Sequence, residues 1–78
     1  MPRFYFHLHN DVEAIDEEGM ELADLEAARE EAIRSGRDLV AEGVRNGQVN
    51  LSHWIEVHDE SGTQVLVVRF GDVVRIDS

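Results

Sequence analysis

The chain has 78 residues, and a domain of this size buries only about 60% of the surface that its unfolded chain exposes. Seventeen Asp and Glu residues oppose seven basic residues, and the formal charge of −10 disfavours direct contact with nucleic acid or anionic membranes. The absence of cysteine excludes disulfides and thiolate zinc sites, and no apolar run approaches the roughly 20 residues of a membrane span. We therefore expect a single cytoplasmic domain over residues 1–78, in which self-association adds to a thin core.

The N-terminal residues alternate with the period of two that is typical of a β-strand. The apolar positions are Phe4, Phe6 and Leu8, and the positions between and after them are Tyr5, His7 and His9. Asn10–Asp11 has good turn chemistry, because both side chains tolerate positive φ. Residues 12–15 are therefore predicted to return as a second, shorter strand, which a loop over residues 16–19 ends at Gly19.

A helical period begins at Asp24, after which apolar side chains recur every three or four residues. Asp24 suits the N-cap position, and Asn46–Gly47 is a typical helix end. This pattern predicts a helix of about 22 residues, long enough to cross a small sheet. Gly36 and Gly43 lie on or beside the apolar stripe, so we expect the helix to lie close against the sheet at those positions.

The last third of the chain predicts a second hairpin, with strands over residues 53–58 and 64–70 and a turn over residues 59–63. Residues 73–76 are apolar enough for a short terminal strand, although residues 71–78 are also consistent with a frayed tail.

These elements predict an α+β fold of the order ββαββ, with one long helix on one face of a four-stranded antiparallel sheet. The simplest strand order is 2-1-3-4, which makes every neighbouring pair antiparallel. One helix cannot cover both faces, so the second face, here called the open face, is the predicted interaction surface. Its expected residues are Tyr5, His7, His9, Trp54, Glu56, His58, Val65 and Val67.

Aromatic rings with polar tips suit an interface, so the open face predicts a self-associating chain, most simply a dimer. The alternative is that residues 73–76 fold over this face within one chain. A second hypothesis is a small metal-binding protein, because His7, His9 and His58 with Glu56 offer ligands that zinc accepts. No H-E-x-x-H or similar motif is present, and we expect neither a metal nor another cofactor.

The residues give no support for an enzyme, since the chain lacks a phosphate-binding loop and a serine nucleophile elbow. A dense acidic surface, Asp16, Glu17, Glu18 and Glu21, precedes the helix. Beside an edge strand these charges discourage edge-to-edge pairing, and they also suit a basic protein partner. A third hypothesis is a regulator that contacts nucleic acid through the helix arginines Arg29, Arg34, Arg37 and Arg45.

Three segments carry a resemblance to a known family: the start MPRFYFHL, the segment EGMELADLEAAR over residues 18–29, and the block WIEV with Asp59. They resemble a family of short bacterial proteins, common in soil alphaproteobacteria, that is classed as a domain of unknown function. Members of that family tend to have proline at the position of Ala23 and glycine in the first hairpin, and these departures leave the predicted fold intact. The resemblance implies no activity and no site residues.

A looser architectural similarity connects the chain with antitoxin domains of the HicB type, although their Pro-Gly-Cys turn and DNA-binding segment are missing here. Architecture alone does not transfer function. The sequence therefore predicts a non-enzymatic protein-interaction module, with the metal-binding protein as the alternative.

Overall fold

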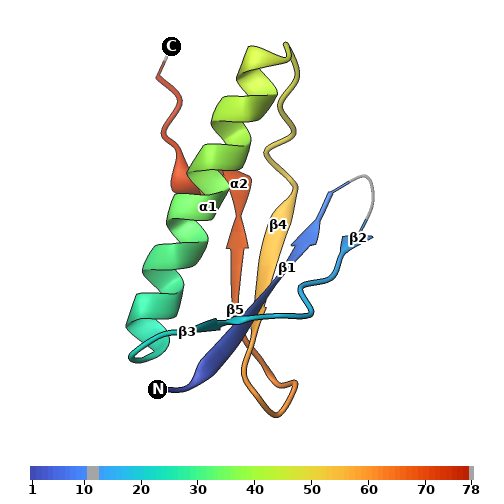
Figure 1. Ribbon diagram of the computed structural model, residues 1–78. Coiled ribbons are helices and arrows are strands. Elements are labelled where there is room, and N and C mark those ends of the chain that lie inside the picture. Colours follow the sequence, from blue (N-terminus) through green and yellow to red (C-terminus); the bar gives the residue numbers. More distant parts are fainter. Residues whose placement is uncertain (11–12, 78) are drawn as a thin grey trace.

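A computed structural model describes residues 1–10 and 13–77 (Figure 1). The fold is α+β, with one long helix and an open antiparallel sheet, as the sequence predicts. The sheet has five strands, so the predicted number of four is wrong. In chain order the elements are β1 (Arg3–His9), β2 (Glu13–Ala14), β3 (Met20–Glu21), α1 (Leu25–Arg45), β4 (Trp54–His58), β5 (Gln64–Arg69) and α2 (Phe70–Val73).

The strands run in the order β2-β1-β4-β5, and β3 pairs separately with the start of β1. Asp11 of the predicted turn and Val12, the first residue of the predicted second strand, lie outside the described residues. The additional strand β3 places Met20 opposite Phe4. Two residues are too short to show a period of two, which is why the sequence pattern does not reveal β3.

Helix α1 begins and ends where the sequence predicts. The Asp24 carboxylate accepts a hydrogen bond from the N–H of Ala27 at 2.9 Å, which satisfies one of the unpaired donors of the first turn. Asn46 is the C-cap, and Gly47 follows it with a φ of +83°, in the left-handed region that favours glycine.

The two helix glycines face neighbours other than the predicted sheet. A Cβ at Gly36 would lie 3.4 Å from the side chain of Val73 in α2, and a Cβ at Gly43 would lie 2.5 Å from the carbonyl oxygen of Gln48. The prediction of close approach is right, but the partners are α2 and the segment after the helix. The segment after α1 returns past Gly43 from the turn at Gly47, whereas α2 reaches Gly36 as the continuation of β5.

Phe70–Val73 form the short helix α2, and residues 74–77 belong to neither a helix nor a strand, so of the two predicted alternatives the terminal strand over residues 73–76 is wrong. Val73 is buried against α1, and its carbonyl oxygen accepts a hydrogen bond from Arg37 Nε at 2.8 Å. These contacts hold the segment on the helix side of the sheet. It therefore does not cover the open face at Val73, as the alternative prediction required.

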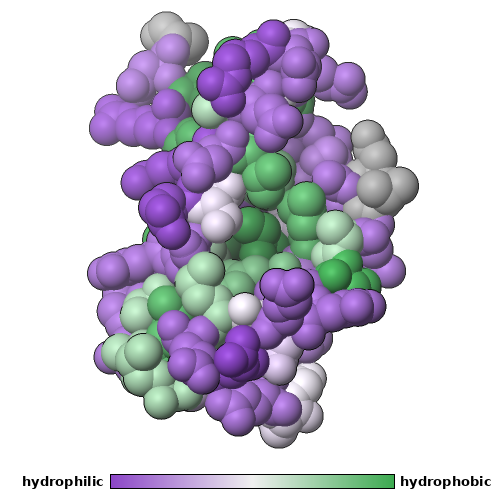
Figure 2. Space-filling model, in the orientation of Figure 1, coloured by the Kyte–Doolittle hydropathy of each residue, from purple (hydrophilic) through white to green (hydrophobic). Residues whose placement is uncertain are grey.

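The core lies between α1, the strands β4 and β5, and α2. Its buried apolar residues are Phe4, Ala28, Ala32, Val40, Ile55, Val57, Val68, Phe70 and Val73. On β1, Phe6 and Leu8 are only half-buried, because α1 crosses β4 and β5 and leaves part of β1 uncovered. Figure 2 shows the result as a hollow lined by apolar side chains between α1 and the strands β1 and β2.

Within residues 1–10 and 13–77, no helix combines the length and apolarity that crossing a bilayer requires.

Candidate functional site

The open face is assembled by the pairing of β4 with its two neighbours. Tyr5 lies opposite His58, His7 opposite Glu56, and His9 opposite Trp54, so these six side chains share one side of the sheet. All six are half-buried. The register of β4 with β5 adds Val67, opposite Glu56, and Arg69, opposite Trp54, both of which are exposed.

Val65 does not follow the predicted alternation. A β-bulge between Val57 and His58 shifts the register so that Leu66 pairs with Val57 and Gln64 with His58, leaving Val65 as the extra residue. Val65 and Leu66 both pack against the core. The sequence prediction assumed a regular strand, and a bulge is the feature that a period of two cannot reveal.

Glu56 is the centre of a hydrogen-bond network on the open face. Its Oε2 accepts from Trp54 Nε1 and lies 3.1 Å from His9 Nε2, while its Oε1 lies 3.1 Å from His58 Nε2. The hydrogen bonds from Trp54 and His58, helped by the charge of His9 and opposed by burial, hold the pKa of Glu56 below its usual value. The carboxylate is thus fixed in its charged form by its neighbours.

The aromatic rings of the open face pack against one another. His9 stacks on Trp54 with ring centres 4.9 Å apart and planes at 6°, and His7 meets the edge of His58 at 4.6 Å. His9 also lies 3.1 Å from Glu13 through Nδ1. The face is therefore preorganised before any partner arrives, which lowers the entropic cost of forming an interface on it.

Asp16 connects the open face to the loop before β3. Its carboxylate accepts hydrogen bonds from the backbone N–H groups of Phe6, Glu18 and Gly19 at 3.0–3.1 Å. Burial raises the pKa of Asp16, but these N–H donors and the nearby His7 outweigh it and lower the pKa. The N–H of Asp16 itself donates to His7 Nδ1 at 3.0 Å, which fixes His7 in the tautomer protonated at Nε2.

The predicted metal ligands do not converge as a ligand set. A zinc ligand needs a free lone pair on a ring nitrogen, and Nδ1 of His7 is occupied by the Asp16 N–H. Both nitrogens of His9 point at carboxylates, and His58 points at Glu56. No group of three or more His, Asp or Glu side chains among the described residues is placed to hold a metal ion.

The four residues of the predicted acidic surface have different environments. The Asp16 carboxylate is occupied by the backbone N–H groups that it accepts hydrogen bonds from, and the Glu21 carboxylate lies 3.3 Å from the Arg3 guanidinium. Glu17 and Glu18 are exposed, and they are the two members whose carboxylates remain directed to solvent. The acidic surface is therefore smaller than the sequence suggests, because half of it is used to hold the loop and the β1 edge together.

The helix arginines are engaged locally and do not form a basic strip. Arg34 pairs with the buried Glu31, which raises the pKa of Arg34, and Arg29 lies 3.9 Å from Glu26. Arg37 donates to the backbone of α2. Three of the four predicted nucleic-acid contacts thus already have partners within the chain.

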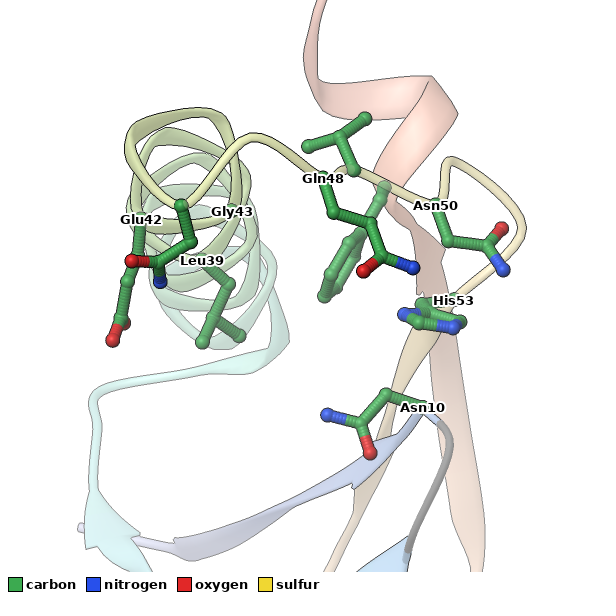
Figure 3. A pocket seen from close by; sticks show the side chains of 10 residues that line it. Asn10, Leu39, Glu42, Gly43, Gln48, Asn50 and His53 are labelled. Carbon is green, nitrogen blue, oxygen red and sulfur yellow. The ribbon is translucent and has the colours of Figure 1, made fainter.

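A second site, which the sequence analysis missed, lies where the helix-side hollow meets the end of α1. This cleft of about 390 Å³ is shown in Figure 3. Leu39 extends from α1 on the side that faces Asn10, which follows β1, while Glu42 extends from the side of the helix away from His53. Among the residues that the structure describes, the lining is Asn10, Leu39, Glu42, Gly43, Asn46, Gln48, Val49, Asn50, His53 and Phe70.

The wall of the cleft is the segment after α1, held by backbone hydrogen bonds. The N–H of Gln48 donates to the carbonyl of Gly43 at 2.9 Å, which is feasible only because Gly43 has no side chain. Asn50 Oδ1 accepts from Ser52, and the N–H of Phe70 donates to the carbonyl of His53 at 2.8 Å. The sequence signal for this wall is the run of carboxamide residues after the helix. By local pattern alone, that run predicts only a helix end.

Comparison with known proteins gives a family and nothing closer. Neither the curated proteins nor the solved structures gave a significant match. Residues 3–71 match the family described as Domain of unknown function (DUF6894), a range that includes every strand, α1, the open face and the lining of the cleft. The chain therefore belongs to the DUF6894 family.

Proposed function

We propose that this protein is a non-enzymatic interaction module that forms a homodimer through the open face and presents acidic surface to a basic protein partner. The observation that supports this most is the open face itself. It is a preorganised surface of indole, phenol and imidazole rings on the side of the sheet opposite α1. Rings of this kind supply large contact area with a polar tip and are enriched at protein interfaces.

Charge favours a second copy as the occupant of this face. Two chains that each carry −10 repel one another over most of their surfaces. The open face carries the carboxylates of Glu56 and of Glu13, which lies opposite His9, against the guanidinium of Arg69. At its edge Arg3 and Glu21 pair with each other, so the formal charge of the face is only −1 when the histidines are neutral. Two copies meeting here bring fewer unpaired carboxylates together than orientations through the more acidic surfaces would.

The remaining surface suits a partner of opposite charge. Glu17 and Glu18 stay exposed at one edge of the sheet, where they steer a cationic protein toward the module. The architectural similarity to HicB-type antitoxin domains, which neutralise a protein partner, is consistent with this use but remains an analogy.

Light scattering on the full chain at high micromolar concentration tests the dimer. We expect a mass twice that of the 8.8-kDa chain. Trp54→Ala, which removes the largest ring of the face, should weaken association by about tenfold or more. Val44→Ala is the matched control, because Val44 is also an exposed apolar residue but lies on α1.

A monomer at that concentration, or a Trp54→Ala variant with the dimer mass, would contradict self-association through this face. The basic partner is tested separately, by association rates that fall as salt rises. A partner whose association rate is independent of salt would argue against steering by Glu17 and Glu18.

A further inference from the structure

We infer that the cleft at the end of α1 binds an extended segment of the basic partner, taking one arginine or lysine side chain and its flanking backbone. This inference rests on the proposed function and names the chemistry that the module recognises. The cleft lies on the helix side of the sheet, so it stays accessible when two copies meet through the open face.

The charge of the lining selects a cation. Among the lining residues that the structure describes, Glu42 is the one carboxylate and none is an arginine. Glu42 is exposed, and within residues 1–10 and 13–77 it makes no ion pair. The C-terminal end of α1, which carries partial negative charge, lies in the same wall, so a cation is favoured and a phosphate or carboxylate is repelled.

The apolar part of the lining suits the stem of a long basic side chain. Leu39 is half-buried, Val49 is 38% exposed, and the buried ring of Phe70 lies beneath them. Arginine and lysine bury their methylene groups along apolar surface while the charged head stays with a polar partner. A volume of about 390 Å³ is at the lower end of the range for small-ligand pockets, which fits one side chain and adjacent backbone.

The carboxamides distinguish a peptide from a small amine. The side chains of Asn46 and Gln48 each carry one acceptor and two donors at the cleft. A peptide backbone presents N–H and C=O groups to match both the acceptors and the donors, whereas a free ammonium group can only donate and would leave the carboxamide N–H groups unmatched. Asn50 is excluded from this set, since its oxygen already accepts from Ser52 and its side chain points away from the cleft (Figure 3).

The test is an NMR titration of the isotope-labelled full chain with the capped pentapeptide Gly-Val-Arg-Val-Gly. We expect saturable shifts confined to the cleft, including the side-chain amide of Gln48, with a dissociation constant of about millimolar or tighter. The same peptide with Glu in place of Arg should give no saturable shift. Glu42→Gln should weaken binding of the Arg peptide by about fivefold or more.

The matched control is Glu30→Gln, because Glu30 is an exposed α1 carboxylate outside the cleft, and this variant should bind as the wild type does. The inference is overturned if the Arg peptide gives no saturable shifts at millimolar concentration. It is also overturned if the Glu peptide binds equally well, if Glu42→Gln has no effect, or if the shifts centre on Trp54.

Trp54→Ala separates this inference from the dimer. A monomeric Trp54→Ala chain that still binds the Arg peptide supports the cleft independently of self-association. A wild-type dimer that gives no cleft shifts refutes the peptide site and leaves the dimer standing.

Discussion

The open face and the cleft differ in how far their polar groups are satisfied within the chain. On the open face, Glu56 lies within hydrogen-bonding distance of three side chains, two imidazoles and an indole. In the cleft, Glu42 has no ion-pair partner among the described residues. The imidazoles, the indole and Glu56 of the open face are therefore largely occupied by contacts with one another, whereas Glu42 in the cleft is able to pair with a ligand.

The cause of this difference is the geometry that brings each set together. Side chains opposite one another on adjacent strands have Cβ atoms about 5 Å apart, so polar groups on the open face reach each other directly. The cleft is bounded by a helix end and a returning segment, whose separation is set by Gly43. Its side chains face a gap and have fewer neighbours within reach.

The largest expected effect is on the free energy of unfolding, and it compares a buried residue that lines the cleft, Phe70, with Trp54 on the open face. Phe70→Ala removes a ring that is 5% exposed, and should lower the free energy of unfolding by about 3–5 kcal/mol. Trp54→Ala, on a half-buried ring, should cost about 1–2 kcal/mol, because less apolar area is lost from the interior. Urea unfolding followed by circular dichroism, at one fixed low protein concentration, measures both.

Equal costs for these two variants would mean that Trp54 belongs to the core of the monomer and is not available for an interface. The open face and the cleft would then not differ in how their aromatic residues contribute to the core of the monomer.

A medium effect is expected at Gly43, the helix glycine that lines the cleft. Gly43→Ala places a Cβ 2.5 Å from the Gln48 carbonyl oxygen, so the wall must shift and stability should fall by about 1–3 kcal/mol. Gly36→Ala is the control, because its Cβ meets only the Val73 side chain at 3.4 Å. There, the higher helix propensity of alanine should stabilise the chain by up to about 1 kcal/mol.

Thermal unfolding measures both variants. If the Gln48 carbonyl oxygen is held close to Gly43, the melting temperature should fall in Gly43→Ala and rise in Gly36→Ala. Stabilisation by Gly43→Ala would show that the Gln48 segment can move away from α1 at little cost.

The smallest effect concerns acid stability at the loop behind the open face. The pKa of Asp16 is lowered from its ordinary 3.8, so its contribution to folding is fully present above that value. The contribution is lost as pH falls through the lower folded-state pKa. Asp16→Asn should therefore destabilise the chain at neutral pH by about 1 kcal/mol and make little difference once the pH is below the folded-state pKa.

Urea midpoints at neutral pH and at pH values below the ordinary carboxylate range measure this effect. Glu17→Gln is the control, because Glu17 is exposed, and its midpoint should follow the wild type throughout. An Asp16→Asn variant with an unchanged midpoint at neutral pH would show that the loop does not depend on this carboxylate.

Local patterns predicted the regular parts of the fold because their signals lie within a few residues. Asp24 and Asn46–Gly47 bound α1 through capping chemistry, and the alternation along β1 and β4 places the imidazoles and the indole on one face. Strand β3 and the bulge at Val65 were not predictable in this way. The first is too short for a period, and the second interrupts one.

The sequence by itself determined the helix, the two hairpins and seven of the residues that share the open face, all except Val65 of those predicted, because turn chemistry and side-chain period are local properties. Only the tertiary structure decided that Asp16 holds a loop, that Gly43 admits the Gln48 segment, and that Leu39, Asn10 and Phe70 meet around one cleft. These relations depend on where α1 crosses the sheet, and packing between distant segments sets that position.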